Sequence, residues 1–148
     1  MAKALDIPLD PGMTFADAAA LTVRVRAQEV FDHAENVLDV SDIERVHAMR
    51  VATRRLRAVL EIFEPAFPSR RHKAALKEVK ALADALGERR DPDVQLEALQ
   101  DVEGVGAFTV RVQAEQAAGN DTLATKLREI EEHDLRGRLD ALVAEARP

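Results

Sequence analysis

The stretch SDIERVHAMRVATRRLRAVLEIF, residues 41–63, decides the fold. Apolar side chains recur in it every three or four residues, which is the spacing of one face of an α-helix. Ser41 is followed three residues later by Glu44, a pairing typical of a helix start, and Pro65 lies just beyond Phe63. We therefore predict a helix over 41–63. Its packing stripe consists of Val46, Met49, Thr53, Leu56, Leu60 and Phe63.

The rest of the chain divides into further helices at glycine, proline and capping residues. Thr14 and Asp17 form a second capping pair, Gly87 marks a helix end, and Asp91-Pro92 marks a helix start. No segment has the alternating pattern of a strand. We predict an all-α bundle of about six helices, with an extended arm over 1–12, a helical domain over 13–148 and its motif region over 41–100. The predicted helices cover 14–38, 41–63, 69–87, 91 to about 104, 108–118 and 122–146.

Length and composition exclude several classes of protein. A chain of 148 residues with 47% hydrophobic and 32% charged residues is typical of one folded domain. Because it contains no cysteine, disulfides, thiol nucleophiles and thiolate zinc sites are excluded. No apolar run approaches the roughly 20 residues that span a bilayer, and the N-terminus lacks a secretory signal. We expect a cytoplasmic protein without membrane partners.

The formal net charge of −6 hides a strongly uneven distribution. Residues 45–90 hold twelve Lys or Arg and five Asp or Glu, so this segment carries +7. The remainder holds nine basic and 22 acidic residues, and therefore carries −13. Either the basic third binds an anion, or the acidic remainder neutralises it within the molecule.

The basic residues follow helical faces. In the helix over 41–63 four of them lie within an arc of about 80°, beside the apolar stripe. The next helix repeats this arrangement, and helices joined by a short turn pack as antiparallel neighbours. We therefore predict a shared basic groove, with Arg89 and Arg90 near one end. In the helix over 41–63 the row consists of His47, Arg50, Arg54 and Arg57, and in the helix over 69–87 it consists of Lys73, Lys77 and Lys80.

This mixture of cations suits phosphate. The planar fork of arginine donates two parallel hydrogen bonds to phosphate oxygens, and lysine adds a mobile point charge. His47 would add a donor whose protonated form a polyanion favours. The other interpretation of His47 is a half-buried histidine that bonds a backbone carbonyl.

The segments VHAMRVATRRLRAVLEIFEPAFP (46–68) and LKEVKALADALGERRDPDVQLEAL (76–99) resemble the CHAD family, the conserved-histidine α-helical domain. The similarity covers roughly residues 12 to 100. It implies a helical binding domain for inorganic polyphosphate, often associated with polyphosphate granules. The polyphosphate-binding residues that we predict are His47, Arg50, Arg54, Arg55, Arg57, Lys73, Lys77, Lys80, Arg89 and Arg90.

The chain also departs from the family pattern. Members usually contain two tandem four-helix halves, and only the first is recognisable here, since the stretch 132–139 echoes the second only faintly. Asp84 stands where the family often has a basic residue. We expect a half-length member that forms a homodimer and so restores the missing half.

Other functions have weaker support in the sequence. Glu44 and His47 have the Glu-x-x-His spacing of di-iron bundles, but a second copy is missing, and no phosphate-binding glycine loop occurs. We predict no catalytic residue, metal or cofactor, and expect His33 and His72 at the surface. Without Trp or Tyr, stacking on nucleic-acid bases has little support. General polyanion binding, nucleic-acid binding and binding of an acidic protein stay open as alternatives.

Overall fold

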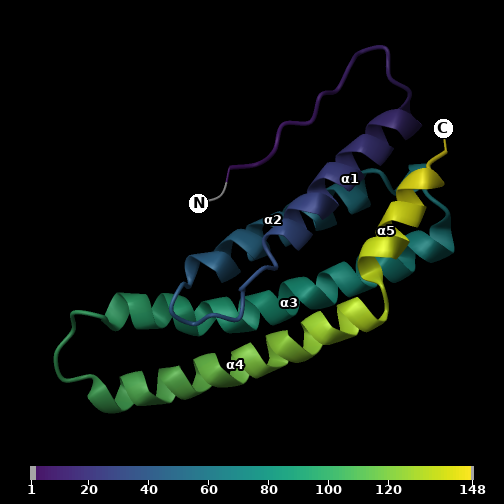
Figure 1. The fold of residues 1–148 in the computed structure, drawn as a ribbon. Helices are drawn as coiled ribbons and strands as arrows, with labels where there is room; N and C mark the ends of the chain where they lie inside the picture. Colours follow the sequence, from purple (N-terminus) through teal and green to yellow (C-terminus); the bar gives the residue numbers. More distant parts are fainter. Residues whose placement is uncertain (1–2, 148) are drawn as a thin grey trace.

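The computed structural model describes residues 3–147, which contain five α-helices and one short 3₁₀ turn joined by loops (Figure 1). No strand occurs among these residues, so the all-α prediction is confirmed. The predicted count of about six helices is close, and the difference lies in where the helices end. The elements are α1 (Phe15–Asp32), α2 (Glu44–Ile62), η1 (Glu64–Ala66), α3 (Ser69–Leu99), α4 (Gly106–Glu132) and α5 (Leu135–Ala144).

Helix α1 begins where the sequence predicted and ends earlier. The Thr14 hydroxyl accepts a hydrogen bond from the backbone N–H of Asp17 at 3.1 Å, which caps the helix. The helix ends at Asp32 instead of residue 38, and Asn36 adopts a left-handed φ of 56°. Before α1, the backbone N–H of Leu5 donates to the buried carboxylate of Glu29 in α1 at 2.9 Å. Residues 1 and 2 of the predicted arm lie outside the described residues.

Helix α2 begins without the predicted capping pair of Ser41 and Glu44, and other contacts are found near its two ends. The Ser41 hydroxyl donates to Asp39 Oδ1 at 2.6 Å, and α2 begins at Glu44 without a side-chain cap, so that prediction is wrong. At the other end, His72 Nε2 lies 2.6 Å from the carbonyl oxygen of Leu60. His72 is 1% exposed, although we expected it at the surface. It is a structural residue between α2 and α3.

Helix α3 is continuous over 31 residues, whereas the sequence predicted an end at Gly87 and a new start at Asp91. Pro92 lies buried within it, and because proline has no N–H, the carbonyl of Glu88 lacks its helical donor. This carbonyl faces α4, since a Cβ placed on Gly119 would lie 2.9 Å from the Glu88 oxygen. Close packing against α4 thus holds together a helix whose local sequence favours a break.

Helix α4 is also continuous through Gly119 and Asn120, where a break was predicted. Gly119 is buried and lets α3 approach, so the glycine marks a close helix crossing instead of an end. Asn120 Nδ2 donates to the carbonyl of Leu38 at 3.2 Å and ties the loop after α1 to α4. The break falls at Asp134, which has a φ of 51° and accepts from the N–H of Gly137 to begin α5.

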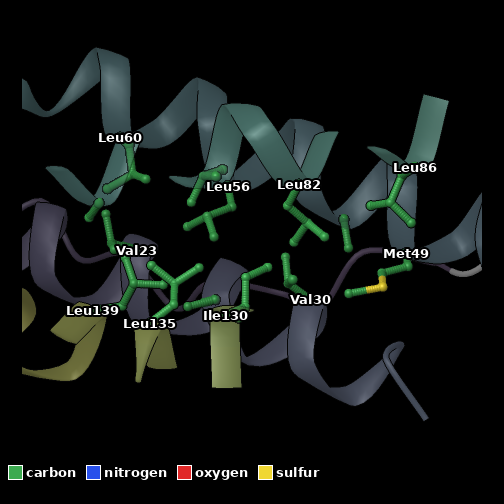
Figure 2. Close-up of a cluster of buried hydrophobic side chains, with 14 of the residues drawn as sticks. Val23, Val30, Met49, Leu56, Leu60, Leu82, Leu86, Ile130, Leu135 and Leu139 are labelled. Atoms are coloured by element: carbon green, nitrogen blue, oxygen red, sulfur yellow. The ribbon is translucent and has the colours of Figure 1, made fainter. Parts of the chain in front are cut away.

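The core collects apolar side chains from all five helices (Figure 2). Figure 1 shows the α3–α4 hairpin extending beyond the ends of α1 and α2. Because α2 and α3 each bury one stripe in this core, their neighbouring faces remain at the surface. The labelled core residues in Figure 2 are Val23, Val30, Met49, Leu56, Leu60, Leu82, Leu86, Ile130, Leu135 and Leu139.

Candidate anion-binding surface

Helices α2 and α3 run antiparallel and bring their basic faces together. Arg50 Nε lies 3.9 Å from the position that a Cβ on Gly87 would occupy. Further along, Lys80 Nζ lies 3.9 Å from Glu61 Oε1. These two contacts set the register of the pair, in which the row on α2 runs beside the row on α3. We call this the basic surface, consisting of His47, Arg50, Arg54 and Arg57 on α2 and Lys73, Lys77, Lys80 and Arg90 on α3.

Most cations of the basic surface have no acidic partner in the part of the chain that the structure describes. Within residues 3–147, no carboxylate oxygen lies within 4.0 Å of the charged groups of five of them. Like charges on neighbouring helical positions repel one another, so a bound anion would lower this electrostatic repulsion. The five are Arg50 and Arg90, which are half-buried, and Arg54, Lys73 and Lys77, which are exposed.

Among residues 3–147, one acidic side chain forms ion pairs with cations of the basic surface, whereas the exposed Asp84 on the lysine face of α3 forms none. Glu61 Oε1 accepts from Arg57 Nε at 3.2 Å and also forms the contact with Lys80. All three side chains are about half exposed, between 44% and 46%. Glu61 follows Arg57 by four residues, and this helical spacing is the sequence signal that could have identified the pair.

His47 and Arg90 retain unused hydrogen-bonding capacity. Nδ1 of His47 and one terminal nitrogen of Arg90 are buried without a partner among the described residues. His47 is half-buried, as its structural interpretation expected, but its Nδ1 bonds no backbone carbonyl among the described residues. Arg55, the remaining predicted residue of α2, is half-buried. It lies about 100° around the helix from Arg54, outside the basic surface.

The structure does not bring Arg89 to this surface. Its side chain is fully buried, with Nη2 3.2 Å from Asp93 Oδ1. The same carboxylate oxygen accepts from Gln116 Nε2 of α4 at 2.7 Å. Arg89 therefore belongs to the contact between α3 and α4. The i,i+4 spacing of Arg89 and Asp93 is a signal for this pair, but periodicity alone does not say which face of α3 meets α4.

Neutralisation by the acidic remainder occurs at only a few places. Arg71 at the start of α3 pairs with Glu145, just after α5. Arg45 at the start of α2 pairs with Asp42 at 3.1 Å. In the opposite sense, Glu78 of the basic segment pairs with Arg138 and His133 of the remainder. None of these pairs involves a cation of the basic surface, so that surface keeps its positive charge.

The described residues lack two other kinds of feature. Among them, no group of three or more His, Asp or Glu side chains is placed to hold a metal ion. None of their helices is long and apolar enough to cross a membrane.

The fold and the surface together define an all-α protein with a cationic face built from two adjacent helices. The chain belongs to the CHAD domain family, whose model matches residues 22–148. This match extends past residue 100, the expected limit of the resemblance, and includes α4 and α5. No curated protein and no solved structure matches the chain significantly.

Proposed function

We propose that this protein binds inorganic polyphosphate on the basic surface and does so without catalysis. One observation carries the proposal: five cations that have no acidic partner within residues 3–147 lie on two adjacent helices of a protein whose net charge is −6. Membership of the CHAD family supports it, because the resemblance implies polyphosphate as the ligand.

The shape of the row favours a linear anion. Lys73, Lys77 and Lys80 share one face of α3 over about 10 Å, at a rise of roughly 1.5 Å per residue. Arg90 lies about 15 Å further along the helix, and the exposed Asp84 stands on the lysine face between Lys80 and Arg90. Arg50 and Arg54 on α2 lie beside the same line. A chain of phosphates, each carrying negative charge, can contact arginine forks and lysine ammonium groups along this line and release counterions as it does so.

Replacing two arginines of the row tests the surface. Arg54→Ala combined with Arg57→Ala should weaken the binding of long-chain polyphosphate at least about tenfold, because both phosphate contacts are lost. Stability should change by no more than about 0.5 kcal/mol, since both side chains are exposed. The matched control is Arg111→Ala with Arg128→Ala on α4, which removes the same charge elsewhere. Titration calorimetry measures both variants, and equal losses would contradict the proposed surface.

Competition between anions separates the alternatives. If long-chain polyphosphate displaces single-stranded nucleic acid at physiological salt, the polyphosphate proposal stands. Equal affinities would instead favour a general polyanion-binding module. Binding to neither would favour an acidic protein as the partner. Catalysis is tested separately by measuring phosphate release from polyphosphate with Mg²⁺ present, and sustained release would contradict a purely binding role.

We also propose that two copies associate, as expected from the family pattern. The exposed apolar side chains on the projecting α3–α4 hairpin support this: Val94 is 47%, Val102 51% and Val110 65% exposed. Light scattering at micromolar concentration tests it, and a monomer that still binds polyphosphate tightly would overturn it. In cells, we expect a fluorescent fusion to co-localise with cytoplasmic polyphosphate granules.

A further inference from the structure

Glu61 divides the basic surface into two unequal parts. On one side lie Arg50, Arg54 and Arg90, none of which has an acidic partner within residues 3–147. The exposed Asp84 of α3 lies on this side too, but forms no ion pair among the described residues. In the middle, Glu61 holds Arg57 and Lys80. Lys77 and Lys73 follow beyond it, towards the start of α3. An anion that extends along the whole row must therefore pass the carboxylate of Glu61.

We infer that Glu61 is an internal counterion that a long anion displaces and a short anion leaves in place, so that this residue sets how affinity depends on chain length. The inference rests on the proposed function. It follows from position, because Glu61 Oε1 occupies a place between two cations that a phosphate oxygen would otherwise take. A short anion can bind among Arg50, Arg54 and Arg90 without reaching Glu61.

The contacts of Glu61 are suited to displacement. Arg57, Lys80 and Glu61 are all 44% to 46% exposed, so water screens both ion pairs and each contributes little free energy. Repulsion between Glu61 and an approaching phosphate adds to the cost of a long ligand. The same cations become available once the carboxylate swings away, since glutamate, arginine and lysine side chains at a surface change rotamer readily.

Substitution of Glu61 by its neutral isostere tests the inference. Glu61→Gln should raise the affinity for long-chain polyphosphate about three- to tenfold, because two weak ion pairs no longer compete and one repulsive charge is gone. The affinity for triphosphate, measured in the same buffer by calorimetry, should change less than about twofold. The matched control is Glu64→Gln in η1, which removes the same charge from a residue with no ion pair among the described residues. Its effect on the long chain should be smaller than that of Glu61→Gln.

The possible results distinguish a failure of the proposed function from a failure of the role inferred for Glu61. If the wild-type protein binds no polyphosphate of either length, the proposed function is wrong, and this inference falls with it. If the wild type binds long chains but Glu61→Gln has no effect, only the inference is overturned. Equal gains for triphosphate and long chains, or equal gains for Glu61→Gln and Glu64→Gln, would show a general charge effect and would also overturn it.

Discussion

Gly119 is the residue on which the close contact between α3 and α4 depends, and we expect Gly119→Ala to destabilise the protein. In an open helix the same change would stabilise by about 1 kcal/mol, because alanine has the higher helix propensity. Here the new Cβ would lie 2.9 Å from the carbonyl oxygen of Glu88 and 3.2 Å from Cα of Arg89. These are backbone atoms that cannot rotate away, so overpacking should cost near the upper end of the usual range, about 3 kcal/mol. The expected net loss is about 2 kcal/mol.

Chemical and thermal unfolding, followed by circular dichroism, measure this loss. For a chain of this length, about 2 kcal/mol corresponds to a fall in Tm of roughly 4–8 °C. Gly87→Ala is the matched control, since Gly87 also lies inside a helix but its nearest neighbour would be Arg50 Nε at 3.9 Å, an ordinary contact. That variant should gain about 0.5–1 kcal/mol. If Gly119→Ala were as stable as the wild type, the close crossing of α3 and α4 would be refuted.

Two further predictions concern side chains away from the basic surface. Arg89→Leu leaves the carboxylate of Asp93 buried without its cation, and should lower the free energy of unfolding in urea by about 3–5 kcal/mol. The double variant Arg89→Leu with Asp93→Leu should recover much of this loss. Equal losses for the single and the double variant would contradict a buried pair. Hydrogen bonds from the Ser41 hydroxyl and backbone N–H hold the pKa of Asp39 below its usual range, so its contribution to stability is complete at neutral pH and is lost as the pH falls through that lowered pKa. Ser41→Ala should raise this pKa, as measured by NMR titration, and an unchanged pKa would contradict the role of the hydroxyl.

The fold class could be predicted because apolar periodicity is a local property. The stripe through Met49, Leu56 and Leu60 is readable from spacing alone, and all three side chains are buried. The helix ends were less predictable. Pro92 and Gly119 signal breaks locally, yet both lie inside continuous helices, because α3 and α4 pack against each other on both sides of these residues.

The candidate site was predictable to a similar degree. Arg50, Arg54 and Arg57 share a helical face by spacing, and their place beside α3 followed from the short turn between the helices. The role of Arg89 was not predictable in this way. Both of its neighbours in sequence, Glu88 and Arg90, are charged, which locally suggests a solvated segment, but the packing of α4 with Gln116 decides that the charge of Arg89 is buried and paired with Asp93.

The sequence by itself determined the all-α class, the uneven charge and the helical rows of cations, because each depends on residues within a few turns of one another. Only the tertiary structure decided that Glu61 stands between Arg57 and Lys80, and that Arg89 leaves the surface to join Asp93. Both depend on which helix faces which, and at which register. The i,i+4 spacings indicate the partners Arg57–Glu61 and Arg89–Asp93, but only packing across the whole bundle sets that Lys80 approaches the first pair and Gln116 the second.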